Sequence, residues 1–311
     1  MNMAQREKMA QREKMATGRG FIAALDQSGG STPGALRKYG VPESEYVTDE
    51  EMYDLIHEFR SRIITSPRFD GDRILGAILF EQTMDRTVDG MNVVRYLWGR
   101  KRIVPFVKVD QGLAAESDGV RLMKPLTGLQ PLLERAVARR VYGTKMRSVI
   151  RRADPRGVAA VLDQQFAVGQ EILRAGLVPI LEPEVDVTSP EKAQAEDLVR
   201  AGILERLSLI PPGAQVMFKL SLPTVDDLYL ELTRQPMVLR VVALSGGYSR
   251  EEADVRLARN RGLVASFSRA LTEGLTRQQS VDDFDKALDA SIAAIYTASC
   301  TSRGRPSLAG P

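Results

Sequence analysis

Residues 214–224 read Ala-Gln-Val-Met-Phe-Lys-Leu-Ser-Leu-Pro-Thr, an apolar run that carries a single lysine, Lys219, toward its carboxyl end. A continuous apolar run of this length predicts a strand that is buried on both faces, as in parallel sheets. An ammonium group is costly to bury, so a lysine in such a strand either finds a partner or gives up its proton. The run therefore predicts an internal strand with an unusual lysine.

Lys219 is a candidate nucleophile. A neutral lysine amine attacks ketones and aldehydes, and the iminium that forms withdraws electrons so that a neighbouring carbon-carbon bond can break. Burial and a second cation nearby both disfavour the ammonium form, so we expect Lys219 to be held uncharged. The alternative is a structural lysine whose stem lies along the strand while its charged end reaches the edge of the sheet.

Seven further apolar runs resemble this one and alternate with longer stretches of helical period. The eight predicted strands span residues 21–25, 74–80, 104–109, 144–150, 177–181, 215–220, 238–244 and 264–267. Predicted helices span 49–65, 157–175, 191–207, 249–261, 268–274 and 280–299, and we expect residues 110–143 to hold more than one helix. Eight βα units predict an α/β protein with a single-domain (β/α)8 TIM barrel. No strand-to-helix turn carries a dinucleotide fingerprint or a P-loop.

The two ends of the chain differ from its middle. Residues 3–8 and 9–14 repeat the hexapeptide Met-Ala-Gln-Arg-Glu-Lys, to which we assign no function. We expect residues 1–17 to form a polar N-terminal extension, 18–300 the catalytic barrel, and 301–311 a flexible tail.

The composition excludes several kinds of protein. The 43 Lys and Arg nearly balance 40 Asp and Glu, and no basic tract indicates a nucleic-acid partner. No apolar run is long enough for a membrane span or a signal peptide. Cys300 is the only cysteine, which fits a reducing, cytoplasmic location. His57 is the only histidine, which argues against a zinc site and against a histidine-activated nucleophile, so we expect no metal.

Polar residues two positions apart close five of the predicted strands, and residues two apart share a face of a strand. The carboxyl ends of all strands meet at one mouth of a barrel, where such enzymes place their active sites. The alternative is an internal ion-pair network that fills the barrel. The pairs are Asp26 with Ser28, Lys108 with Asp110, Lys145 with Arg147, Glu182 with Glu184, and Lys219 with Ser221.

These pairs suggest different chemical roles for the residues at the strand ends. Lys145 and Lys219 would each disfavour the proton of the other, and Glu182 or Glu184 could move protons during imine formation. At the next strand end, the Ser245-Gly246-Gly247 turn opens a helix, and Arg269 follows the last strand. Loops after strands seven and eight form the common phosphate site of this fold.

A second anion could bind across the mouth, near Ser28, Ser31 and Lys108. The predicted substrate therefore carries two phosphate groups, and the bond to be broken lies between them.

Taken together, these segments resemble class I fructose-1,6-bisphosphate aldolase, the Schiff-base type that needs no metal, and the shorter bacterial form in particular. The resemblance runs from about residue 18 to residue 274. The segments are Gly-Arg-Gly-Phe-Ile-Ala-Ala-Leu-Asp-Gln-Ser (18–28), Gly-Ala-Ile-Leu-Phe-Glu (76–81), Val-Lys-Val-Asp-Gln-Gly (107–112), Thr-Lys-Met-Arg (144–147), Val-Pro-Ile-Leu-Glu-Pro-Glu (178–184), Phe-Lys-Leu (218–220), Leu-Ser-Gly-Gly-Tyr-Ser (244–249) and Phe-Ser-Arg-Ala-Leu (267–271).

The resemblance implies reversible cleavage of fructose 1,6-bisphosphate to dihydroxyacetone phosphate and glyceraldehyde 3-phosphate, a step of glycolysis and gluconeogenesis. It implies an imine on Lys219, with Glu182 as general acid and base, Asp26 on the proton of the C4 hydroxyl, Lys145 assisting at the carbinolamine, and Glu184 orienting Glu182 and Lys219. It assigns Ser245, Gly246 and Arg269 to the phosphate nearer the ketone, Ser28, Ser31 and Lys108 to the distal phosphate, and Arg147 to charge balance. No cofactor is implied, and family members often form homo-oligomers.

Two residues depart from the family pattern. Ser268 precedes Arg269 where many family members carry glycine, which puts one backbone contact to phosphate in question. Animal-type enzymes end in a tyrosine that protonates the enamine, whereas the nearest tyrosine here is Tyr296, inside the chain.

Other functions stay open at this point. Another Schiff-base aldolase acting on a different sugar phosphate would share the lysine, and a non-catalytic barrel would serve only in assembly. A metal-dependent aldolase is opposed by the single histidine.

Overall fold

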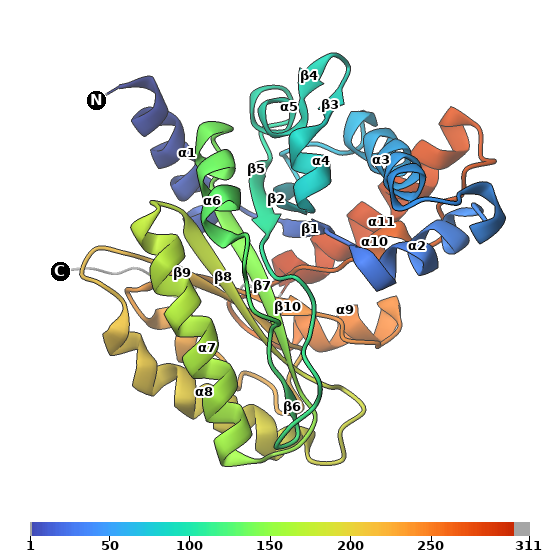
Figure 1. Ribbon diagram of the computed structural model, residues 1–311. Coiled ribbons are helices and arrows are strands. Elements are labelled where there is room, and N and C mark those ends of the chain that lie inside the picture. The colour runs from blue at the N-terminus through green and yellow to red at the C-terminus, as the bar shows by residue number, and fades with distance from the viewer. Residues whose placement is uncertain (1, 302–311) are drawn as a thin grey trace.

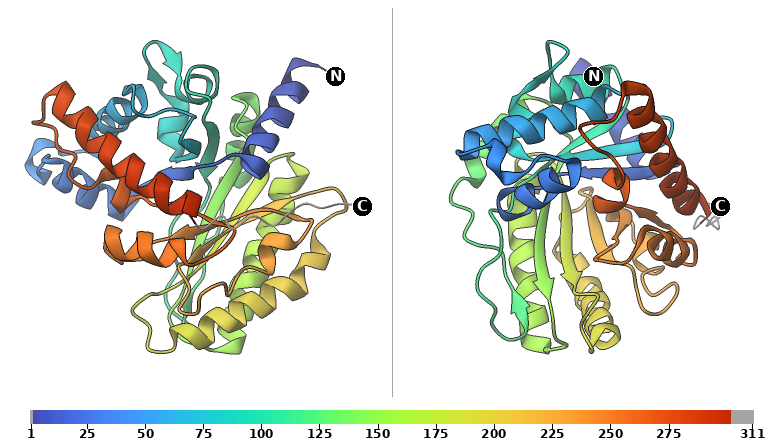
Figure 2. Two further views of the ribbon diagram at one scale, coloured as in Figure 1. Left: turned by 180° about the vertical axis from the view of Figure 1, so that it is seen from behind. Right: turned by 90° about the vertical axis from the view of Figure 1, so that its right-hand side faces the viewer.

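The chain folds into a barrel of eight parallel strands surrounded by helices, which confirms the predicted architecture (Figures 1 and 2). The computed structural model describes residues 2–301, so the predicted tail lies outside the described residues except for Thr301. In barrel order the strands are β1 (Phe21–Leu25), β2 (Ile74–Leu79), β5 (Val104–Lys108), β7 (Gly143–Ile150), β8 (Val178–Val185), β9 (Val216–Ser221), β10 (Val238–Leu244) and β11 (Leu263–Ala265).

Neighbouring strands from β1 round to β11 form seven parallel ladders. At the remaining junction, which we call the seam, the Ala24 amide on β1 donates to the Phe267 carbonyl just after β11 at 3.3 Å. All eight predicted strands are present. The largest difference is at β8, which continues to Val185 because it stays paired with β7 as far as Ile150.

Apolar side chains fill the barrel below its mouth. One buried cluster takes residues from seven of the eight strands, Phe106, Ile180 and Met217 among them. The eighth strand, β7, contributes Gly143, where an added Cβ would lie 2.9 Å from the Phe106 ring. Because side chains alternate along a strand, the residues two positions beyond these apolar ones also point inward, one layer closer to the mouth. Polar residues occupy that layer.

The helices cover the outside of the barrel, and α7 and α8 lie side by side against the strands that carry the mouth residues (Figure 1). Capping residues mark where helices begin; for example, the Asp154 side chain caps α7 by accepting hydrogen bonds from the Arg156 and Gly157 amides. The larger helices are α2 (Thr32–Tyr39), α3 (Asp49–Thr65), α5 (Val93–Gly99), α6 (Leu129–Ala138), α7 (Pro155–Arg174), α8 (Lys192–Arg206), α9 (Arg250–Ala258) and α11 (Val281–Thr301), with short α4 (Glu81–Asp85) and α10 (Arg269–Thr272) between them.

The interval 110–143 differs from the expectation of more than one helix. It holds α6 alone, preceded by a short strand, β6 (Val120–Arg121), that pairs antiparallel with the end of β7. Asp118 and Gly119 both have positive φ and turn the chain back toward β7. Helical periodicity does not detect such a turn.

The first helix, α1 (Met3–Thr17), contains both hexapeptide copies and packs against the end of the barrel away from the mouth. Met15 is fully buried in the inner apolar cluster. The guanidinium of Arg240, on β10, donates to the carbonyls of Met15 and Ala16, each at 2.8 Å. A helix with a polar sequence thus covers the end of the barrel that lies away from the mouth. No helix among residues 2–301 is long and apolar enough to cross a bilayer.

Candidate active site

A cavity of about 910 Å³ opens at the carboxyl ends of the strands, and all twelve residues singled out from the sequence line it. Its lining holds seven Lys and Arg side chains against four Asp and Glu side chains, so the cavity favours an anionic ligand. The twelve residues are Asp26, Ser28, Ser31, Lys108, Lys145, Arg147, Glu182, Glu184, Lys219, Ser245, Gly246 and Arg269.

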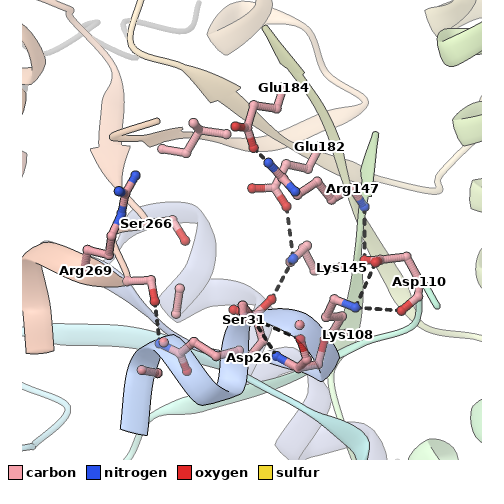
Figure 3. Close-up of a pocket in the computed structure, with 18 of the residues that line it drawn as sticks. Asp26, Ser31, Lys108, Asp110, Lys145, Arg147, Glu182, Glu184, Ser266 and Arg269 are labelled. Atoms are coloured by element: carbon pink, nitrogen blue, oxygen red, sulfur yellow. Dashed lines mark hydrogen bonds and ion pairs between the residues drawn. The ribbon is translucent and has the colours of Figure 1, made fainter. Parts of the chain in front are cut away.

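Four of these side chains form a continuous chain of charges across the mouth. Figure 3 shows three of them, Asp26, Lys145 and Glu182. Lys145 Nζ lies 2.6 Å from Asp26 Oδ2 and 3.0 Å from Glu182 Oε2. The other oxygen of Glu182, Oε1, lies 3.0 Å from Lys219 Nζ. All four residues are buried, and Glu182 connects the two lysines.

The charges of this chain stabilise one another. Burial would raise the pKa of Glu182 and of Asp26, but the positive charges of Lys145 and Lys219 outweigh it and hold both pKa values below their usual range. Burial would lower the pKa of Lys145, but Asp26 and Glu182 raise it above its usual value. Both carboxyl groups are therefore ionised at neutral pH, and Glu182 can accept a proton from a neighbouring ammonium.

The contact between Lys219 and Glu182 bears on one expectation. From burial and the cation of Lys145 we expected an uncharged amine, and Lys219 Nζ in fact lies 3.0 Å from Glu182 Oε1. Strand alternation places Glu182 on the same face without giving this distance.

A second layer of ion pairs supports the first. Arg147 Nε lies 2.5 Å from Glu184 Oε2, so the ion-pair partner of Glu184 is Arg147, in place of the expected contacts to Glu182 and Lys219. Lys108 Nζ lies 2.8 Å from Asp110 Oδ1, and the other Asp110 oxygen accepts from the Arg147 amide at 3.2 Å. Asp110 thus joins two site residues. The sequence placed it beside Lys108, but we gave it no role.

The turn after β10 is shaped by glycine. Gly246 has φ 61° and Gly247 has φ 136°, both in the region that favours glycine. An added Cβ on Gly246 would lie only 2.5 Å from the Val187 side chain. Arg269, the first residue of α10, projects from the neighbouring strand end, and Figure 3 shows it across the cavity from Lys108. The turn and Arg269 form what we call the proximal corner.

The loop after β1 forms the opposite, distal corner. The Ser31 hydroxyl accepts from the Ser28 amide and donates to the Ser28 carbonyl, each at 3.0 Å. This pair of bonds folds the loop into a short 3-10 turn, residues 29–31, directly before α2. Lys108 lines the same cavity from β5.

Residues 2–301 contain no group of three or more His, Cys, Asp or Glu side chains arranged to hold a metal ion. His57 lies on α3, where its Nε2 is 3.0 Å from the Thr87 carbonyl oxygen. Tyr296 lies on α11 and is not among the residues that line the cavity.

Gln27 and Arg60 had no role in the sequence reasoning, and Ser268 entered it only as a departure from the family pattern. Gln27 and Ser268 line the cavity and are hydrogen-bonded to each other, although 241 positions separate them in the chain. The buried side chain of Arg60, on α3, donates a hydrogen bond to the Gln27 carbonyl. No local pattern in the sequence reveals such contacts.

The fold and the site together define a class of protein. A (β/α)8 barrel with a lysine amine, a carboxylate and a second lysine in contact at its mouth has the arrangement expected of an enzyme that forms an imine with a carbonyl compound. The cationic lining indicates a phosphorylated compound.

Comparison with known proteins gives the family. The family model described as "Glycolytic: Fructose-bisphosphate aldolase class-I" matches residues 7–194. A relative from Synechocystis sp. named fructose-bisphosphate aldolase class 1 is 57% identical over 282 residues, which cover 91% of this chain and 94% of the relative. One of the same name from Clostridium acetobutylicum is 53% identical over 283 residues, covering 91% and 96%. The chain belongs to the class I fructose-bisphosphate aldolase family.

Solved structures agree with the fold. The fructose-bisphosphate aldolase of Plasmodium falciparum superimposes with a TM-score of 0.75 at 22% identity, and the match covers 97% of this chain and 96% of that one. Cgl0159 from Corynebacterium glutamicum gives a TM-score of 0.55 at 17% identity, covering 96% and 95%. At these identities the likeness concerns the barrel alone.

Proposed function

We propose that the chain cleaves fructose 1,6-bisphosphate reversibly to dihydroxyacetone phosphate and glyceraldehyde 3-phosphate, through an imine on Lys219. The contact of Glu182 with both Lys219 and Lys145, inside a cationic cavity, carries this proposal. Family membership supports the reaction, since the relatives at 53% to 57% identity bear its name. Class I enzymes of this family are lyases that need no metal, and we expect no other cofactor.

Imine formation begins with the ion pair. Glu182 accepts a proton from the Lys219 ammonium, and the free amine then adds to the C2 carbonyl of the sugar. Glu182 returns that proton to the former carbonyl oxygen, and it then carries a second proton from the nitrogen to the resulting hydroxyl, which leaves as water while the iminium forms. The ammonium of Lys145, 3.0 Å from Glu182, stabilises negative charge that develops on that oxygen.

Asp26, at the other end of the chain of charges, would assist cleavage of the carbon-carbon bond. Asp26, ionised because of its lysine neighbours, accepts the proton of the C4 hydroxyl while the C3–C4 bond breaks and its electrons move into the iminium. Arg147 neutralises Glu184 and keeps the mouth from accumulating negative charge. The enamine that remains takes up a proton at C3 to become an imine again, and hydrolysis of that imine releases dihydroxyacetone phosphate and frees Lys219.

The two corners would hold the two phosphate groups. Ser245, Gly246 and Arg269 would bind the phosphate nearer the ketone, and Ser28, Ser31 and Lys108 would face the distal one. Backbone amides in a glycine turn and a guanidinium are both good phosphate ligands. A homo-oligomeric state and a cytoplasmic location remain predictions, the latter supported by the single cysteine.

Trapping tests the proposal directly. The enzyme is incubated with dihydroxyacetone phosphate and borohydride, and the reduced adduct is located by peptide mass mapping. We expect one adduct, on Lys219. An adduct on another lysine, or none, would contradict the proposed mechanism.

A different Schiff-base aldolase reaction is tested with the substrate. If both corners bind phosphate, removing the distal phosphate should lower kcat/KM substantially, as measured with fructose 1-phosphate against fructose 1,6-bisphosphate. Equal values for the two sugars would favour a different physiological substrate.

A further inference from the structure

Each of the two corners has one residue beside the seam of the barrel. The distal corner begins at Ser28, just after β1, and Arg269 of the proximal corner follows directly after β11. All other neighbouring strands form parallel ladders, whereas β1 and β11 are joined at the seam by the bond from the Ala24 amide to the Phe267 carbonyl. The distance between the two corners therefore depends on what holds the seam together near the mouth.

Gln27 and Ser268 provide that connection. Gln27 Nε2 donates to Ser268 Oγ at 2.5 Å, one step nearer the mouth than the Ala24–Phe267 bond. Both residues line the cavity. Each is adjacent in sequence to a corner residue, Gln27 to Ser28 and Ser268 to Arg269.

Arg60 fixes the geometry of this bond. Its side chain is buried, with Nη1 donating to Thr83 Oγ1 at 2.7 Å and Nη2 donating to the Gln27 carbonyl at 2.5 Å. The same Nη2 lies 3.4 Å from Gln27 Oε1. Because a guanidinium only donates, the oxygen of the Gln27 amide faces Arg60 and its NH2 group is left to face Ser268. The amide therefore has one orientation.

The serine is needed for this bond. At the position before Arg269, only a residue with a side-chain acceptor can take the Gln27 hydrogen bond. A glycine at this position would lack the contact.

We propose that the Gln27–Ser268 bond, oriented by Arg60, is a positioning device that sets the spacing of the two phosphate corners and so determines the preference for a bisphosphate over a monophosphate. This inference rests on the proposed function. None of the three residues needs to touch the reacting carbons. A ligand with one phosphate uses one corner and is insensitive to the spacing, whereas a bisphosphate must engage both.

The test compares two substrates in two variants. Gln27→Met keeps the volume of the side chain and removes its amide, and Ser268→Ala removes the acceptor. For each we expect KM for fructose 1,6-bisphosphate to rise about 3- to 10-fold, the loss typical of one buried hydrogen bond. KM for fructose 1-phosphate should stay within about twofold, and kcat for both sugars should change little.

Three further variants sharpen the result. Gln27→Met combined with Ser268→Ala should lose no more than either alone, because both remove one bond. Ser268→Thr, which keeps a hydroxyl, should keep most of the preference for the bisphosphate that wild type shows. Gln165→Met is the matched control, since Gln165 Nε2 donates to Ser148 Oγ at 3.1 Å away from the cavity. It should lower the melting temperature and leave both KM values unchanged.

The outcomes separate this inference from the proposed function. If wild type cleaves the bisphosphate and Gln27→Met changes KM for both sugars equally, or for neither, the positioning role is wrong while the aldolase activity stands. A direct contact between Ser268 and phosphate would instead make Ser268→Ala additive with Gln27→Met. If wild type cleaves neither sugar and traps no adduct, the proposed function itself fails.

Discussion

Two buried lysine–glutamate pairs lie within one short stretch of this barrel and differ in what surrounds them. Lys219 and Glu182 meet inside the mouth at 3.0 Å, with side chains 6% and 3% exposed. Lys192 and Glu196 meet on α8, outside the barrel, with side chains 8% and 0% exposed. Burial and pairing alone do not distinguish them.

The two pairs differ in whether their remaining donors and acceptors have other hydrogen-bond partners. Lys192 Nζ also donates to the Leu222 carbonyl at 2.8 Å and to Thr224 Oγ1 at 3.1 Å, and the second oxygen of Glu196 accepts from the Thr224 amide at 2.9 Å. This pair is saturated and holds the chain that follows β9. Within residues 2–301, Glu182 is the one ion-pair partner of Lys219, whose amine otherwise faces the cavity. A buried ion pair becomes reactive when part of it is left open to a substrate.

Replacing each lysine with methionine should give the largest contrast. Lys219→Met removes the proposed nucleophile, and we expect kcat to fall on the order of 10⁴-fold or more, while Glu182 keeps its contact with Lys145. Lys192→Met leaves Glu196 buried without a cation, so the free energy of unfolding should fall by about 3 to 5 kcal/mol. Steady-state kinetics measures the change in kcat of both variants, and urea unfolding measures the change in their free energy of unfolding. Comparable losses of kcat would contradict the distinction between the pairs.

The two glutamates sharpen the contrast at a smaller scale. Glu182→Gln removes the proposed proton carrier and should lower kcat by about 10²- to 10⁴-fold, with an equal slowing of borohydride trapping. Glu196→Gln should lower the free energy of unfolding by about 1 to 3 kcal/mol through a mismatched buried hydrogen bond. Its pH profile of kcat should keep the wild-type shape. A displaced profile in Glu196→Gln would show that the outer pair affects the chemistry.

The smallest expected effect is on acid stability. The pKa of Asp26 is lower in the folded protein than its unfolded value of about 3.9. Its contribution to stability is therefore complete above about pH 4 to 5 and is lost as pH falls further. The difference in free energy of unfolding between wild type and Asp26→Asn should shrink from pH 5 toward pH 2, as followed by urea midpoints. Parallel curves over that range would mean that Asp26 contributes nothing through its charge.

The sequence predicted features that depend on local pattern. All eight strands are apolar runs, and the twelve site residues share one cavity because alternation along each strand and convergence at the mouth are rules of the fold. Features that depend on distance in space were not predictable. The position of Glu182 between two lysines, the docking of α1 through Met15 and the Gln27–Ser268 bond all join segments far apart in the chain.

The seam also bears on how the protein is assembled. Its two sides, β1 and the segment after β11, are nearly the first and last parts of the barrel to be synthesised, so the ring closes only when almost the whole chain is available. Contacts so distant in sequence form slowly. Turnover of the proposed bisphosphate, which would engage both sides of the seam, is therefore expected to report complete folding, since a chain that ends before the segment after β11 lacks Arg269.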